Sequence, residues 1–328
     1  MRRSKSRLIF WSSEWAASLR GGLFFVRFRI KKRPKTNKKR LTFLFDDDYV
    51  TVMLRKYDIV KSLSSLAFAV AGGAVFAAPA SAEVSCSSSA GATVSLTDYV
   101  TRTSACLNTA EGLVADAEDA LAAEVNAARE ALGLAPLKRR DGLDMAARVH
   151  ALDMSGRDYL GHSDPEGRNH LFRIRAFDRS ILVGDFGANV VKVPVRFSGR
   201  EILNSMGQDD ANAFNLIRET FTDMGVGVIE KDGALYVVVT FADVQGVLEE
   251  PVPLSPRRSQ SLKADMDESL KPVTWALNDV VTGERLRLGY GFRLRTVRLT
   301  DQDLAGITIT AEAGLTEVTL KGPMITGR

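Results

Sequence analysis

The sequence predicts an α+β domain followed by a small all-β module. Apolar residues from Val114 to Leu132 recur at steps of three and four, which is the period of one helix face. The segment Tyr236–Phe241 is apolar at almost every position, as expected of a strand covered on both faces. From residue 272 onward only strand patterns occur. These observations indicate mixed α and β structure in a chain of 328 residues, which is long enough for about two domains.

The helices follow from local start and stop signals. Gly133 can end the first helix, and Asp141 can cap a second one. Residues 169–177 have the spacing of a short third helix. Within residues 199–218 we expect two short helices, interrupted at Gly207–Asp210.

The strands of the first domain form an antiparallel sheet in this interpretation. Residues 189–193 favour a strand, and Met224–Glu230 and Leu235–Phe241 are joined by Lys231–Gly233, which is a hairpin signal. Because Tyr236–Phe241 is so uniformly apolar, we place it at the centre of the sheet. Helices on both faces of that sheet would bury it.

A proline-rich stretch separates the predicted domain from the module. We interpret residues 247–271 as a linker and residues 272–328 as the small β module. Three segments of the module alternate apolar and polar residues: 285–288, 292–295 and 307–310. So short a unit buries only a marginal core, and we expect it to dock on the rest of the chain or on a second copy.

The first 82 residues are predicted to lie outside the mature protein. Residues 53–82 have a basic start, an apolar middle and a small-residue end at Ala82, which is the order of a secretory signal peptide. Residues 1–52 are rich in Arg, Lys and Trp, and we interpret them as a non-native extension upstream of a true start at Met53. The alternative is a cytoplasmic basic tail before an uncleaved anchor.

The leader also carries the positive charge of the chain. Residues 1–82 hold 17 of the 44 basic and 5 of the 40 acidic residues, so the remainder has 27 basic and 35 acidic residues and a net charge of −8. Nucleic-acid binding requires a basic footprint on the folded domain, and we therefore exclude it. Membrane contact is expected only transiently, through the signal peptide.

Two cysteines lie in the Ser-rich segment 83–110. In an exported protein, Cys86 and Cys106 are expected to form a disulfide. Closing a loop of about 20 residues stabilises a fold by roughly 3 kcal/mol in the chain-entropy model. The alternative is a pair of free thiols.

Six short motifs follow one another in the first domain. They are, in chain order, Asn126–Arg129, Gly133–Leu137, His150–Met154, Gly161–Gly167, Gly187–Val190 and Phe221–Val228. Together they resemble the bacterial branch of the CAP superfamily (cysteine-rich secretory, antigen five and pathogenesis-related proteins), also called the SCP domain, over residues 111–246. The resemblance implies an α-β-α sandwich.

The resemblance also implies a central cavity lined by two histidines and acidic residues. His162 stands where the family has one of these histidines. Ala188 stands where a glutamate would be, next to Asn189, and Asn212 replaces the second histidine. Zinc sites usually need three or four ligands, and a general base needs a titrating partner within reach. We therefore expect a degenerate cavity at these four residues, with no catalytic residue, metal or cofactor.

The other polar residues of the same motifs have simpler interpretations. His150 lies on the apolar face of the second helix and is expected to be a core histidine. His170 begins the third helix, where a surface or capping role is expected. Asp164 and Glu166 lie in an Asp-Pro-x-Gly sequence that is typical of a turn.

The module carries a set of alternating arginines. They are Arg285, Arg287, Arg293 and Arg295, and each pair is expected to project from one face of its strand. One interpretation is a solvated outer face. The other is contact with lipid phosphate or acidic glycan, for which the guanidinium fork is well shaped.

The sequence thus favours a secreted or periplasmic CAP-like protein that is not an enzyme. It would bind an envelope protein, a lipid or a glycan, and its central cavity would be degenerate. The alternative is an envelope hydrolase or peptidase that uses His162 as a base with Asp209 or Asp210 as its acidic partner. A third possibility makes the C-terminal module the functional part and the CAP-like domain its carrier.

Overall fold

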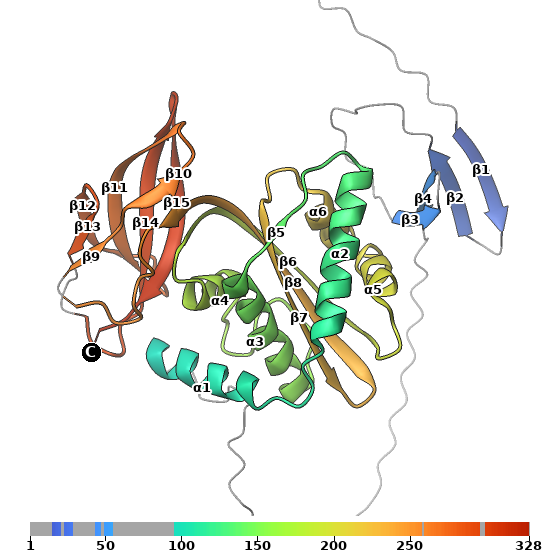
Figure 1. Ribbon diagram of the computed structural model, residues 1–328, viewed down its shortest axis with the longest axis horizontal. Helices are drawn as coiled ribbons and strands as arrows, with labels where there is room; N and C mark the ends of the chain where they lie inside the picture. Colours follow the sequence, from blue (N-terminus) through green and yellow to red (C-terminus); the bar gives the residue numbers. More distant parts are fainter. Residues whose placement is uncertain are drawn as a thin grey trace, which may run out of the picture. The chain divides into compact units, whose positions relative to one another are not determined.

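The computed structural model describes residues 95–257, 259–295 and 299–327, together with the backbone of four N-terminal strands (Figure 1). These strands are β1 (Trp15–Arg20), β2 (Leu23–Phe28), β3 (Phe43–Asp46) and β4 (Tyr49–Leu54), and they form one antiparallel sheet in the order β1-β2-β4-β3. Apart from these strands, the predicted extension 1–52 and signal peptide 53–82 lie outside the described residues, as does Cys86.

The chain forms two compact units. One comprises residues 1–81 and 207–213, and the other comprises residues 82–206 and 214–328. The helices are α1 (Leu96–Asn108), α2 (Ala115–Ala131), α3 (Asp141–Arg157), α4 (His170–Phe177), α5 (Gly199–Met206) and α6 (Asp210–Ile217). Among the described residues no helix is long and apolar enough to cross a membrane.

The helix predictions hold, with three corrections. The interruption after α5 is as expected, and α4 begins one residue later than predicted, with Asn169 as its cap. Asp141 is the first residue of α3 rather than its cap, which is Arg140, so its carboxylate adds negative charge to the first helical turn instead. The Ser-rich segment contains an unpredicted helix, α1, capped by Ser95. Cys106 is buried on α1 and is not a free thiol, while its pairing with Cys86 stays a prediction.

The first domain is the predicted α-β-α sandwich. Its strands are β5 (Lys138–Arg139), β6 (Ile181–Pro194), β7 (Asp223–Lys231) and β8 (Ala234–Leu248). β8 lies between β6 and β7, as its apolar sequence predicts. Alternate β8 residues face opposite layers: Tyr236 packs with α3, and Val237 packs with α2 and α5. Figure 1 shows these helices on the two sides of the sheet. β6 is much longer than the predicted 189–193.

Two glycines of β7 allow α3 to lie directly on the sheet. A Cβ added to Gly225 would be 2.1 Å from the carbonyl carbon of Leu143, and one added to Gly227 would be 2.3 Å from the backbone nitrogen of Arg148. Both contacts are with helix backbone, which cannot move aside by changing rotamer. The Gly-Val-Gly motif therefore sets how closely the helix approaches the strand.

Replacing Gly227 by Ala should destabilise the fold by about 3 kcal/mol, because the new methyl group overpacks a rigid contact. Urea denaturation measures this cost. Gly156→Ala is the matched control, since Gly156 lies in α3 with nothing within 4 Å of an added Cβ. That change should be neutral or stabilise by up to about 1 kcal/mol through helix propensity. Equal effects of the two changes would contradict the close-packing argument.

Five of the seven C-terminal strands that the structure describes continue the sheet of the first domain. The seven are β9 (Ser259–Ser261), β10 (Ala264–Met266), β11 (Leu270–Asp279), β12 (Arg285–Tyr290), β13 (Arg293–Arg295), β14 (Ala305–Ala313) and β15 (Thr316–Ile325). The sheet order is β12-β11-β14-β15-β6-β8-β7-β5, with β10 paired to β8, and the other two strands, β9 and β13, pair with each other in a separate sheet. The segment 247–271, predicted as a linker, thus contains the end of β8, the short strands β9 and β10, and the first two residues of β11. The boundaries of the predicted domains stay predictions.

Two arginines of the α4 region hold the module against the first domain. Arg175 donates to the carbonyl oxygens of Gly322 at 2.7 Å and Ile307 at 2.9 Å. Arg179 donates to those of Val252 at 2.9 Å and of Met324 at 2.6 Å. Burial lowers the pKa of both guanidinium groups to about 10. The module therefore docks on the CAP-like domain, which was the first of the two expected arrangements.

Candidate functional site

The His162 segment is a turn built by Asp164. One carboxylate oxygen of Asp164 accepts hydrogen bonds from the backbone nitrogens of Glu166 at 3.1 Å and Arg168 at 2.8 Å. The Gly167 nitrogen donates to the Asp164 carbonyl at 2.9 Å, and Gly167 has a φ of +82°, which favours glycine. This confirms the turn predicted from Asp-Pro-x-Gly.

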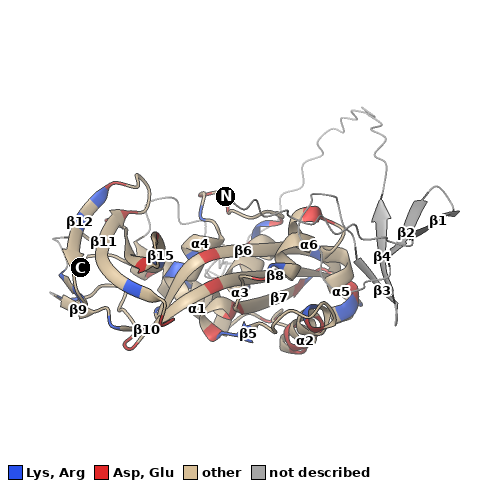
Figure 2. Cartoon of the chain, turned by 90° about the horizontal axis from the view of Figure 1, so that it is seen from above, with Lys and Arg blue, Asp and Glu red and all other residues tan. Residues whose placement is uncertain are grey.

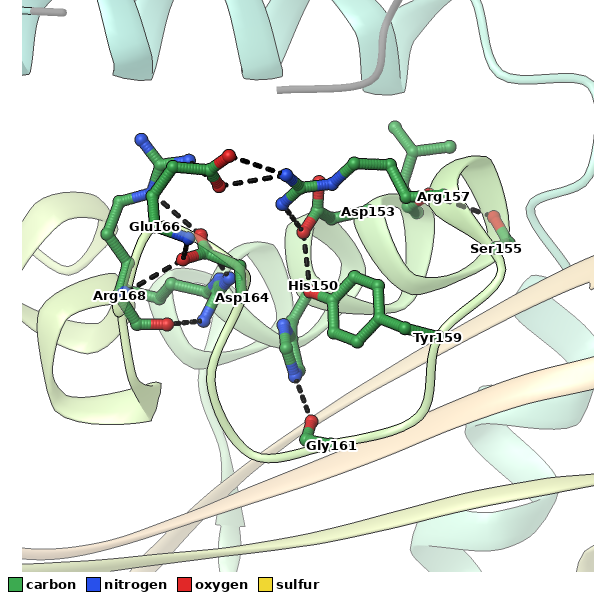
Figure 3. Close-up of polar contacts among 11 residues, drawn as sticks. His150, Asp153, Ser155, Arg157, Tyr159, Gly161, Asp164, Glu166 and Arg168 are labelled. Carbon is green, nitrogen blue, oxygen red and sulfur yellow. Dashed lines mark hydrogen bonds and ion pairs between the residues drawn. The ribbon is translucent and has the colours of Figure 1, made fainter. Parts of the chain in front are cut away.

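The carboxylates of this segment form ion pairs with arginines (Figure 3). The second Asp164 oxygen accepts from Arg168 Nε at 2.7 Å and from Arg173 at 3.0 Å, and the side chains of Asp164 and Arg173 are almost completely buried. Glu166 binds Arg157 at 2.7 Å and Arg168 at 2.8 Å. Both carboxylates thus serve to hold the segment.

The network extends into α3 through Asp153. This buried carboxylate accepts from Arg157 and from the Tyr159 hydroxyl, each at 2.5 Å. Burial and this hydrogen bond raise the pKa of Tyr159, so its hydroxyl stays protonated as a donor. Three carboxylates and three guanidinium groups therefore balance one another around the segment, as paired buried charges require.

All three histidines of the chain meet beside this network. His150 on α3 is fully buried, and its Nε2 lies 2.7 Å from the Gly161 carbonyl oxygen. Because a carbonyl only accepts, Nε2 carries the proton. The His170 Nε2 lies 3.2 Å from the His162 Nδ1, and the ring centroids of His150 and His170 are 4.9 Å apart. The Nδ1 atoms of His150 and His170 have no hydrogen-bond partner among the described residues.

The environment keeps the two buried histidines neutral. Burial, and next the charge of Arg173, lower the pKa of His150 to about 3. Burial, followed by His150 and Arg173, lowers the pKa of His170 well below its usual value. His150 is therefore a core residue, as predicted. The expected surface role of His170 is wrong, because this ring is buried between the other two.

The remaining cavity candidates do not all face one side of the sheet. Ala188 lies on β6 two residues before Val190, which packs against α3, so the two side chains share a face. Asn189 is fully buried on the opposite face, where its Oδ1 accepts from Asn215 Nδ2 at 3.0 Å. Ala188 and Asn189 therefore cannot both line one cavity. Asn189 fixes the end of α6 instead.

The last cavity candidate belongs to the other compact unit. Asn212 is buried in α6, and its backbone nitrogen donates to Asp209 Oδ1 at 2.9 Å. The Ala211 nitrogen donates to the same oxygen at 3.0 Å. Asp209 thus caps the helix. Whether Asn212 and His162 share a cavity stays a prediction.

Sequence reasoning missed the arginines that organise the segment. Arg157 and Arg168 stand four residues after Asp153 and Asp164, a spacing at which opposite charges meet on a helix or tight turn, and this signal was available. Arg173 carried no such signal. Within the described part of the chain, no group of three or more His, Cys, Asp or Glu side chains is arranged to hold a metal ion.

Comparisons with known proteins support the family suggested by the motifs. The sequence profile of the cysteine-rich secretory protein family, CAP, matches residues 122–241. No curated protein matches the chain. One similar solved structure is an extracellular SCP-domain protein from Bacillus anthracis, with 22% identity over 39% of this chain and 40% of that protein and a TM-score of 0.35. This chain thus spans about two fifths of that protein's length.

A second similar structure is an outer surface protein from Borrelia burgdorferi, with 19% identity over 38% of this chain and 90% of that protein and a TM-score of 0.34. The profile match runs from within α2 to within β8, and it includes the His162 segment. The match identifies residues 122–241 as a CAP domain.

Proposed function

We propose that this chain is an exported, non-catalytic binding protein of the cell envelope, in which the CAP domain offers a rigid recognition surface. The observation that carries this proposal is the occupation of both acidic side chains beside His162. Asp164 and Glu166 are bound by arginines that hold the turn. They are therefore committed to structure rather than to proton transfer.

The contacts of His162 support the same interpretation. Its polar partner is His170, whose pKa is far below the usual value, so His170 remains a neutral neighbour. A general base acts best when a second group orients it and takes up charge. Ala188 supplies no carboxylate at the position where the family has glutamate.

Export is supported by the order of features in residues 53–82, which would leave a mature chain beginning at Glu83. The acidic charge of the remainder argues for a partner other than nucleic acid. We propose a secreted or periplasmic location, with an envelope protein, lipid or glycan as the ligand.

A substrate screen tests the proposal against the hydrolase alternative. We expect the exported chain to cleave peptide, ester and glycoside substrates no faster than its His162→Ala variant does. Calorimetric titration with zinc and with calcium should likewise show no tight site. An activity or a stoichiometric micromolar metal site that disappears in His162→Ala would overturn the proposal. Arg200→Ala, an exposed change on α5, is the control. A loss of activity or metal binding that also occurs in this variant would come from the preparation rather than from the removal of His162.

A further inference from the structure

The exposed apolar side chains of the C-terminal module gather on and beside its edge strand. Leu286, Leu288 and Tyr290 on β12 are 37%, 43% and 75% exposed, and Phe292 in the following turn is 48% exposed. We call these four residues the β12 surface. Isolated exposed apolar residues are ordinary, whereas a group of four within seven residues indicates a binding surface.

The alternating sequence of β12 suggests apolar side chains that face the core, but in the structure these side chains face outward. Leu277 and Trp275 on β11 point into the core, and their partners on β12 are Arg287 and Gly289. Directly opposite residues share a face, so Arg287 lies at the rim of the core side. The apolar residues of β12 face outward.

The neighbouring residues on the outward face of β11 are too small to cover these side chains. Leu288 lies opposite Ala276, and Tyr290 lies opposite Thr274, and both partners are small. On the core side, Gly289 makes room for the Trp275 indole, since an added Cβ would be 2.1 Å from that ring. The packing of Trp275 therefore fixes the register that leaves Leu288 and Tyr290 exposed.

Positive charge borders the β12 surface. Arg285, Arg293 and Arg295 are exposed, and Arg287 is half-buried. Among the described residues, none of these four guanidinium groups forms an ion pair. On β13 the buried side chain is Leu294, so Arg293 and Arg295 point to solvent as expected. Figure 2 shows basic residues on β12, at the opposite end of the sheet from β5.

The edge of β12 is protected against pairing with another strand. β12 is the terminal strand of its sheet, and a register shift lies at Leu277/Asn278. Irregular register and charged residues pointing inward, here Arg287, are devices that block edge-to-edge pairing. A second copy that added its own β12 would also bring arginines together. The surface therefore suits a partner that is not a strand.

We propose that the β12 surface binds an anionic phospholipid bilayer. Arginine forks match lipid phosphates, and Tyr and Phe side chains favour the boundary between headgroups and acyl chains. The inference deepens the proposed envelope binding but places it on the module, independent of His162. It also revises the expectation that membrane contact occurs only through the signal peptide.

Position-specific fluorescence tests the proposal in the whole chain. Tyr290→Trp places a reporter on the β12 surface, and Phe214→Trp places one at a similarly exposed site of the CAP domain, 58% exposed. The signal of the native tryptophans is subtracted using the wild type. On vesicles of equal parts phosphatidylglycerol and brominated phosphatidylcholine, we expect quenching at position 290 and none at position 214. Pure phosphatidylcholine vesicles should quench neither.

Charge removal provides the second measurement. Replacing the exposed Arg285 and Arg293 by Gln should weaken vesicle binding about 30-fold, from about fivefold for each basic residue near an anionic surface. Arg196→Gln with Arg200→Gln is the matched pair of exposed changes near α5, and it should leave binding unchanged. His162→Ala should also leave it unchanged.

Three results would overturn the proposal. The first is no binding to anionic vesicles, and the second is binding without quenching at position 290. The third is a blue shift at position 290 that grows with protein concentration in the absence of vesicles, which would identify a second copy as the partner. None of these results bears on the proposed role of the CAP domain.

Discussion

Lowering the pH from 8 to 5 should cost the folded chain about 2 kcal/mol of stability through His150 alone. The folded-state pKa of His150 is about 3, against 6.5 for the exposed side chain. Between these values the unfolded chain binds a proton that the folded chain excludes, so stability falls as the pH falls. The contribution is fully present above pH 6.5, and its loss reaches about 5 kcal/mol below pH 3. His170 acts in the same direction.

Urea denaturation at pH 8 and pH 5 measures this loss. In His150→Gln, whose amide can still donate to the Gly161 carbonyl, the difference between the two pH values should shrink by about 2 kcal/mol. Arg200→Gln should leave the difference unchanged. Carboxylates whose pKa is lowered, such as Asp279 and Glu201, titrate below this window. An unchanged pH dependence in His150→Gln would show that this imidazole is not held neutral by the fold.

The sandwich could be predicted because its signals are local. The apolar stripe on α2 predicts which face of this helix is buried, and the apolar run of β8 predicts a central strand. The helices bury the residues that these patterns indicate. The length of β6 could not be predicted, because Gly184 and Gly187 interrupt its pattern. A Cβ at Gly184 would lie 2.9 Å from an Asp243 carboxylate oxygen, so this glycine reflects packing between strands rather than a turn.

The joining of the module to the CAP sheet had no local signal either. It depends on the pairing of Lys321 with Val183, more than a hundred residues apart, and on buried arginines that donate to backbone carbonyls. Composition rules assign arginine to the surface. For the same reason nothing in the sequence indicated the buried Arg173, which pairs with Asp164 and whose charge adds to burial in lowering the pKa of His150 and His170.

Replacing Asp164 by Asn should destabilise the chain by about 3–5 kcal/mol. The change keeps the size of the side chain and an oxygen that can accept from the turn backbone, but it removes the charge that Arg168 and Arg173 share. Removing one partner of a buried pair leaves the other charge without compensation, which accounts for the size of the effect. Thermal or urea denaturation at pH 8 measures it.

Asp119→Asn is the matched control for the loss of this charge. Asp119 also binds an arginine, Arg139 at 2.7 Å, but its side chain is 81% exposed, so the expected cost is below about 1 kcal/mol. In the variant that combines Asp164→Leu with Arg173→Met, apolar side chains replace both charges, and part of the lost stability should return. If Asp164→Asn unfolded like the wild type and instead abolished a hydrolytic activity, Asp164 would be a catalytic acid. The turn around His162 would then be an active site rather than a recognition surface.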